Sequence, residues 1–261
     1  MIKPDLLVVQ PIHLDFPGFR YQVSKFRHYF NKVIIAWSQH NLEIDVCDWV
    51  ENVSKKDDIT FVSWQEVQAH SAPDWGQRVI STSMNYIKSS YVLISQQDFI
   101  INNDSFFDLV LNTEADLVTH LGYKNPSTTY LEGRCEPDFI LMTMDLWNRT
   151  SKNVQADPPL HDHWGVWSLE AKSLCKELKT LEDFDLISSR DWKHLQHLCL
   201  SYYFLMTDQI GSLPVGFRSS FIEYIRSSFI EYNRFLLTLG IEIEPQTEIL
   251  IQKAANLDGE F

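Results

Sequence analysis

The 261-residue chain contains no lysine- and arginine-rich run, and its formal net charge is −13. A basic patch is the electrostatic footprint of proteins that bind nucleic acid, so we expect no nucleic-acid partner. No apolar run approaches the roughly 20 residues that a membrane helix needs. Met1-Ile-Lys-Pro leads directly into a strand pattern, not into a signal peptide. We therefore expect a cytoplasmic protein without a membrane span.

Paired cysteines are also missing. The four cysteines lie far apart and form no Cys-x-x-Cys motif, at Cys47, Cys135, Cys175 and Cys199. Free thiols in a reducing compartment fit this pattern better than a disulfide framework or a cysteine-based zinc site.

Three catalytic motifs are absent as well. The chain has no Gly-x-x-x-x-Gly-Lys-Ser/Thr loop and no Gly-x-Gly-x-x-Gly after its first apolar run. The sequence therefore supports neither a P-loop NTPase nor a dinucleotide-dependent oxidoreductase. A Gly-x-Ser-x-Gly elbow is missing too, which argues against an α/β-hydrolase.

What the sequence does contain is an alternation of apolar strands and helices. The composition, 44% hydrophobic and 13% aromatic, is sufficient for a large core. The pattern predicts strands at 5–11, 32–37, 58–63, 91–95, 116–121 and 138–144, and helices at 19–30, 44–53, 74–88 and 106–113. This alternation predicts an α/β fold with a mostly parallel sheet and right-handed crossovers.

The C-terminal part changes character. We expect a main domain over 1–190 and a helical extension over 191–261, with helices predicted at 167–178, 192–207 and 217–239. The last of these carries a tandem duplication, Arg218–Ile225 followed by Arg226–Asn233. Eight residues are close to two helical turns, so both copies present nearly the same face. We interpret that face as a packing surface or a homo-oligomer contact, because no catalytic spacing occurs in it.

The strand at 91–95 ends on a polar tip, Gln96-Gln97-Asp98. In open α/β sheets, ligands bind beyond the carboxyl ends of the strands. Asp98 could there hold a metal ion or a substrate diphosphate, or it could cap the following turn. Arg78, in the preceding helix, could contact a phosphate or be an ordinary solvated arginine.

This stretch resembles nucleotide-sugar glycosyltransferases of the GT-A fold, especially the large family-two group. Those proteins commonly show Gly-x-Arg, a helix, and a strand that ends in Asp-x-Asp. The corresponding run here is Gly76-Gln-Arg78, a helix through Lys88, and Tyr91 to Asp98. Two further segments resemble the family's first strand and turn, Val8-Val-Gln-Pro11, and the end of its second strand, Ala36-Trp-Ser38. The likeness covers roughly residues 5–120.

The resemblance implies a Rossmann-like GT-A fold, a nucleotide-sugar donor and a carbohydrate or other hydroxyl acceptor. It implies donor contacts at Pro11, Asp15, Ser38, Arg78, Gln96, Gln97, Asp98 and Trp164. It also implies a divalent cation, Mn²⁺ or Mg²⁺, with Asp98 and His194 as ligands. Gln96 replaces the first carboxylate of the family's pair, and an amide adds no charge for a hard cation. The metal is then weakly held, completed by another ligand, or not used.

A second cluster, Leu160-His-Asp-His-Trp-Gly165, offers a catalytic group. Inverting transfer needs a general base that removes the acceptor hydroxyl proton, and Asp162 beside Trp164 and Trp167 suits that role. Indole faces stack well on sugar rings. Asp162 could equally cap the helix that starts near Trp164, and both tryptophans could be core residues. Weaker candidates for the base are Glu136 and Asp138.

Histidine pairs suggest metal sites less strongly. His161 and His163 have no cysteine or third histidine at ligand spacing nearby, so we expect no structural zinc site. His194 and His197 stand three apart on the predicted helix at 192–207. One of them, His194, could be the late metal-binding histidine of some GT-A enzymes, or both could be edge residues of an amphipathic helix.

Two alternative functions stay open at the level of sequence. Gln96 in place of a carboxylate suggests a catalytically inactive GT-A-like module that binds a sugar or a partner. A sugar-phosphate nucleotidyltransferase uses a related sheet, but it normally carries a glycine-rich basic loop after the first strand. No such loop follows Val9.

Overall fold

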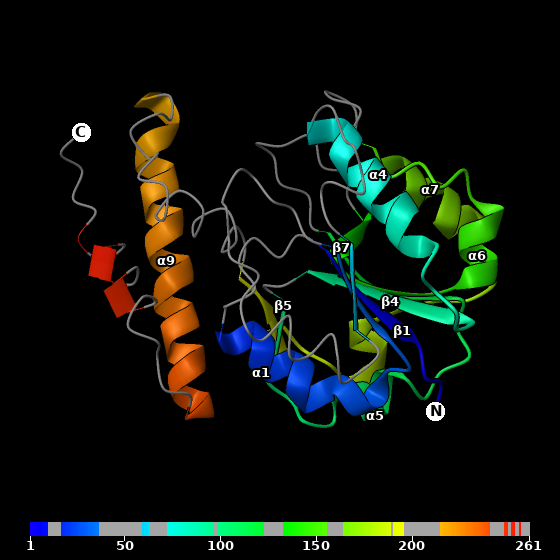
Figure 1. The fold of residues 1–261 in the computed structure, drawn as a ribbon, viewed down its shortest axis with the longest axis horizontal. Helices are drawn as coiled ribbons and strands as arrows, with labels where there is room; N and C mark the ends of the chain where they lie inside the picture. Colours follow the sequence, from blue (N-terminus) through cyan, green and yellow to red (C-terminus); the bar gives the residue numbers. More distant parts are fainter. Residues whose placement is uncertain are drawn as a thin grey trace.

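The computed structural model of the chain describes residues 1–9, 17–36, 59–62, 72–96, 99–122, 133–155, 164–188, 190–195 and 215–240, with 248–249, 252–253 and 256. A seven-stranded sheet forms its centre (Figure 1). Its strands are β1 (Asp5–Val9), β2 (Val33–Ala36), β3 (Ile59–Val62), β4 (Tyr91–Gln96), β6 (Leu117–Leu121), β7 (Cys135–Thr143) and β8 (Leu178–Thr180).

The strand order is β3-β2-β1-β4-β7-β6-β8. Four of the six pairings are parallel, and β7 runs antiparallel to both of its neighbours, β4 and β6. The predicted α/β class, a mostly parallel central sheet flanked by helices, is confirmed.

Helices cover both faces of the sheet, and β1 shows how the sequence divides between them. Leu6 and Val8 face one core, whereas Leu7 and Val9 face the other, as period-two alternation requires. In Figure 1, α4, α6 and α7 lie over one face and α1 and α5 over the other. Their bounds are α1 (Pro17–Phe26), α4 (Ala72–Met84), α5 (Phe106–Val110), α6 (Met144–Arg149) and α7 (Gly165–Leu174), with one-turn 3-10 helices at Arg27–Tyr29 and Leu181–Phe184.

A second, two-stranded sheet joins β5 (Phe99–Ile101) to β9 (Trp192–His194) in antiparallel register. The helix predicted over 192–207 is therefore wrong at residues 192–194, and residues 196–207 lie outside the described part. The physical reason is a distant partner. Trp192 stacks on Phe99 with ring centroids 5.1 Å apart, a contact that local spacing cannot reveal.

The C-terminal duplication lies in one long helix, α9 (Val215–Leu239). It stands at the side of the sheet domain (Figure 1) and buries Phe229, Tyr232 and Leu236 in the same core as α1. The division at 190/191 and an oligomer contact through these helices stay predictions. No helix in the described ranges is long and apolar enough to cross a membrane.

Candidate functional site

The switch point of the sheet lies between β1 and β4. From β1 the chain adds β2 and β3 on one side, and then places β4 on the other side. The last residues of the two strands are register partners, Val9 opposite Gln96. Crevices beyond the carboxyl ends of strands at such a point are where open α/β sheets bind ligands. The described ends of the two segments that carry the family resemblance, Val9 and Gln96, are therefore neighbours at the edge of the sheet.

The predicted site residues are only partly described. Gln96 is half-buried at the end of β4, and Arg78 is exposed on α4. Outside the described residues lie Pro11, Asp15, Ser38, Gln97, Asp98, His161, Asp162, His163 and His197. Asp98 is bracketed in sequence by Gln96 and Phe99, both of which are placed by strand pairing.

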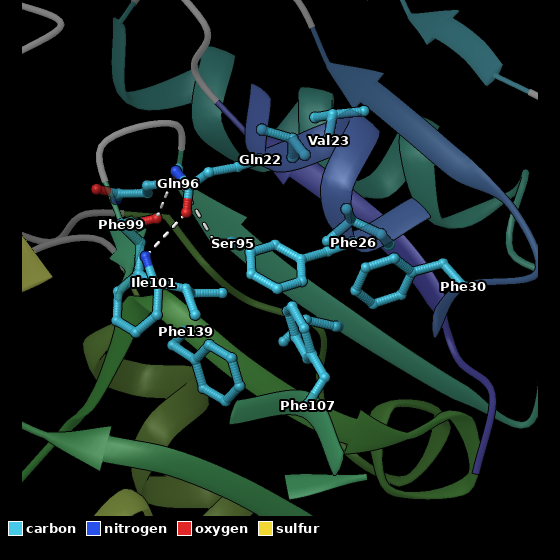
Figure 2. A pocket seen from close by; sticks show the side chains of 13 residues that line it. Gln22, Val23, Phe26, Phe30, Ser95, Gln96, Phe99, Ile101, Phe107 and Phe139 are labelled. Atoms are coloured by element: carbon cyan, nitrogen blue, oxygen red, sulfur yellow. Dashed lines mark hydrogen bonds between the residues drawn. The ribbon is translucent and has the colours of Figure 1, made fainter. Parts of the chain in front are cut away.

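A cavity of about 50 Å³ lies next to Gln96, between α1 and the face of β1 and β4 (Figure 2). Its interior is apolar, with the rings of Phe26, Phe107 and Phe139 among its walls. Polar groups reach it at Gln22 and Gln96. Because those walls also belong to the hydrophobic core, the cavity is a gap in the packing behind the strand ends. Ser95 is a further polar residue of its lining, and among the described residues no charged side chain lines it.

Beside the same strand ends, one carboxyl group lies between two imidazoles. Asp138 on β7 is 1% exposed. Its Oδ1 lies 3.2 Å from Nδ1 of His120 on β6, and its Oδ2 lies 3.1 Å from Nδ1 of His194 on β9. Ser95 on β4 donates a hydrogen bond to the backbone carbonyl of Asp138 over 3.1 Å. The cluster therefore joins the large sheet to the β5–β9 ribbon.

A sheet irregularity creates this cluster. The pairing of β6 with β7 shifts between Thr119, opposite Ile140, and Leu121, opposite Cys135. Pro137 falls in the shifted part, and proline has no backbone N–H for a ladder. Bulges of this kind redirect side chains and are frequent next to active sites. Here the shifted residues include both His120 and Asp138.

The imidazole of His120 is uncharged at neutral pH. Burial, together with smaller effects of the nearby His194 and Arg134, lowers the pKa of His120 to about 3. Its ring also packs against Trp192, with centroids 4.8 Å apart. The contact with Asp138 therefore joins a neutral imidazole to a carboxyl group and is not a pair of full charges.

Glu136, the other weak candidate for a general base, is engaged by Arg134. Nη2 and Nε of Arg134 donate to the two carboxylate oxygens over 2.9 and 3.2 Å. The carboxylate also lies against Gly122, where an added Cβ would stand 1.9 Å from Oε1. Bidentate pairing holds a carboxylate in one orientation, so the carboxylate of Glu136 is already engaged in a contact with Arg134.

The indoles expected to stack on a sugar are in the core. Trp164 and Trp167 are 5% and 0% exposed and meet edge to face with centroids 5.2 Å apart. The backbone N–H of Trp164 donates to the carbonyl of Val154 over 3.1 Å. A sugar contact by Trp164 would require the packed cluster to open, and it stays a prediction.

In the part of the chain that the structure describes, no group of three or more histidine, cysteine, aspartate or glutamate side chains could hold a metal ion. The two described histidines near the site face one carboxyl group, Asp138, through Nδ1. His194 as a metal ligand stays a prediction.

The sequence matches no protein-family model and no curated protein. Solved structures are similar in fold at low identity. The TarS 1–349 structure from S. aureus matches with 10% identity over 96% of this chain and 78% of its own, at a TM-score of 0.48. The mannosyltransferase PcManGT from Pyrobaculum calidifontis, in complex with GDP-Man and Mn²⁺, matches with 13% identity over 98% and 80%, at 0.45. The inositol-1-phosphate CTP transferase from T. maritima matches with 11% identity over 69% and 86%, at 0.43.

Sequence reasoning missed the partnership of His120, Asp138 and His194. These residues come from three strands and lie up to 74 positions apart, the difference between 194 and 120. One signal was available, because an aspartate following a proline inside an otherwise apolar strand is an unusual buried charge.

Proposed function

We propose that the protein is a glycosyltransferase that moves a sugar from a nucleoside-diphosphate donor to a hydroxyl acceptor. The observation that carries this proposal is the pairing of Val9 with Gln96 at the switch point of the sheet. It brings together the two segments whose sequences resemble the donor-binding parts of GT-A enzymes. A switch point is also where this sheet type binds nucleotides.

In this proposal the donor diphosphate lies over the ends of β1 and β4. It is contacted by the turn at Pro11 to Asp15, by Ser38 and by Asp98, with Arg78 and Gln97 nearby. Asp98 would hold a divalent cation, which would supply positive charge for the departing diphosphate. Gln96, which carries no charge, would add only an amide dipole.

The transfer step needs one proton acceptor. The acceptor oxygen attacks the anomeric carbon, its proton passes to the carboxylate of Asp162, and the bond between the anomeric carbon and the phosphate oxygen breaks. The electron pair leaves with the diphosphate. Asp162 is favoured over Glu136, which Arg134 engages, and over Asp138, which is 1% exposed. A general base must reach the proton that it abstracts.

A panel of nucleotide sugars tests the proposal by thermal shift, with and without Mn²⁺. A ligand that binds only the folded state raises the melting temperature in step with its occupancy. We expect one or a few donors to raise it in a concentration-dependent way. If no nucleotide sugar changes the melting temperature, the proposal fails.

Gln96 favours one alternative, a catalytically inactive module of the same fold. Such a module would bind a nucleotide sugar without releasing nucleoside diphosphate. If the protein is an active glycosyltransferase, we expect slow release of nucleoside diphosphate from the bound donor even without an acceptor, because water can replace the acceptor. Binding without any release, with a broad set of hydroxyl acceptors present, would support the inactive module instead.

A further inference from the structure

Gln22 on α1 bonds to the backbone of β5 at two points (Figure 2). Its Nε2 donates to the carbonyl of Phe99 over 3.4 Å, and its Oε1 accepts from the N–H of Ile101 over 2.8 Å. The side chain is only 8% exposed. One carboxamide therefore bridges two alternate residues of a strand that is far from it in sequence.

The two bonds from Gln22 provide hydrogen-bond partners for the short strand β5. β5 has three residues, and its strand partner is the equally short β9. Buried backbone groups need partners, and Gln22 supplies them where no further strand is paired within the described ranges. The ribbon is thereby attached to α1 on the core side of the sheet.

The attachment point adjoins the proposed donor site. Asp98 immediately precedes Phe99 in sequence, and consecutive Cα atoms are about 3.8 Å apart. On the other side of the two-residue segment 97–98, Gln96 is fixed by its pairing with Val9. We propose that Gln22 is a positioning residue for Asp98: its two bonds to β5 fix the backbone from which the Asp98 carboxylate meets the donor diphosphate. This inference rests on the function proposed above.

The chemistry of the position demands a carboxamide. One atom must donate to a carbonyl and the other must accept from an N–H, and the site is lined by apolar rings such as Phe26 and Phe139. Methionine has similar length but could make neither bond. An ionised glutamate could accept from Ile101 but would point a second oxygen at the carbonyl of Phe99.

The chain offers a matched control in Gln77 on α4. Its Nε2 donates to the carbonyl of Lys152 over 2.9 Å, and its Oε1 accepts from the N–H of Val154 over 2.8 Å. Gln77 thus makes the same pair of bonds to alternate backbone groups, but to a segment on the other side of the sheet. Gln77→Met removes the same two backbone bonds, and one further bond from Nε2 to Oγ of Ser81, without touching β5.

The test is a double-mutant cycle between position 22 and Asp98, read as affinity for UDP and GDP with and without Mn²⁺. We expect Gln22→Met to weaken binding about tenfold, as the loss of an orienting partner behind a ligand-binding group commonly does. In an Asp98→Asn background the same change should cost no more than about twofold, because coupled residues are not additive. Gln77→Met should have the same effect in both backgrounds.

Two results would overturn the inference. One is a Gln22→Met protein that binds as the wild type does, with only its melting temperature lowered. The other is a loss of affinity that persists undiminished with Asp98→Asn. Should Gln22→Met fail to fold, Gln22→Glu, which keeps the bond to Ile101, replaces it in the same cycle.

Hydrogen exchange separates this inference from the proposed function. Gln22→Met should speed amide exchange in a peptide covering 93–101, whereas Gln77→Met should speed it around 152–154. If the wild type binds no nucleoside diphosphate, the proposed function fails, and the exchange result alone decides whether Gln22 fixes this backbone. Unchanged exchange at 99–101 would overturn the positioning role.

Discussion

The carboxyl group of Asp138 is shared by His120 and His194, with its two oxygens 3.2 and 3.1 Å from their Nδ1 atoms. His120 belongs to the large sheet and His194 to the β5–β9 ribbon. Phe99, the register partner of His194, follows Asp98 in sequence. Asp138 therefore ties the ribbon to the sheet from one side, as Gln22 ties it to α1 from the other.

Replacing Asp138 by asparagine tests this tie. An amide of the same shape carries no negative charge and turns an NH2 group toward one of the two imidazoles, so at least one of the two close contacts is disturbed. We expect the free energy of unfolding to fall by about 2 kcal/mol, measured by urea denaturation. The control is Asp145→Asn, which breaks an exposed pair with Arg149 on α6 and should cost no more than about 0.5 kcal/mol. Equal effects of the two substitutions would contradict the role of Asp138.

The stability of the protein should depend on pH through His120. Its pKa is lowered to about 3 in the folded state, from 6.5 in a free side chain. Between these values the unfolded chain binds more protons at this site, so stability is full above pH 6.5 and falls as the pH drops. The slope contributed is at most about 1.4 kcal/mol per pH unit.

His120→Gln removes this titration. The free energy of unfolding of the wild type, followed from pH 7 to pH 5, should decrease more steeply than that of the variant. Parallel curves would show that His120 does not carry a lowered pKa in the folded protein.

Gly122 leaves room for the carboxylate of Glu136. In Gly122→Ala the new Cβ would stand 1.9 Å from Oε1, so Glu136 must move and its pairing with Arg134 is disturbed. We expect a loss of about 1–2 kcal/mol, typical of overpacking. With Glu136→Ala in the same chain the clash is gone, and the added cost of Gly122→Ala should largely disappear. Simple additivity of the two changes would count against this explanation.

The two described cysteines should differ in reactivity. Burial raises the pKa of Cys135 to about 11, whereas Cys175 is only partly buried, with a smaller rise in its pKa from the same cause. The thiolate is the reacting form. In the native protein, iodoacetamide should label Cys175 before Cys135, as read by peptide mass spectrometry, and urea should remove the difference. Early labelling of Cys135 would contradict the described packing.

Six of the seven strands of the large sheet were largely predictable because each contains an apolar run. The exception is β8, Leu-Lys-Thr at 178–180, whose first residue falls in the predicted helix 167–178 and which pairs with β6. The predicted 91–95 and 116–121 correspond to β4 and β6 within one residue at each end. β9 was not predicted either, because its three residues form no apolar run. They form a strand because β5 pairs with them and Phe99 provides a ring on which Trp192 stacks. Tertiary contact of this kind overrides local spacing.

The candidate site divides in the same way. The sequence predicted both the strand that ends at Val9 and the strand that ends near Gln96, but not that they pair. Their pairing depends on the crossover from β3 to the other side of β1. The bulge that brings His120 to Asp138 depends on how β6 and β7 shift past Pro137. A register shift leaves no periodic pattern in sequence, and Asp138 was therefore considered only as a possible base.

We propose above that Asp98 belongs to a nucleotide-sugar site at the ends of β1 and β4. Calorimetric titration of the wild type and Asp98→Asn with the donor found in the panel tests it most directly. We expect saturable binding by the wild type and an affinity at least about tenfold lower for the variant. Equal affinity of the two proteins, at unchanged melting temperature, would contradict it.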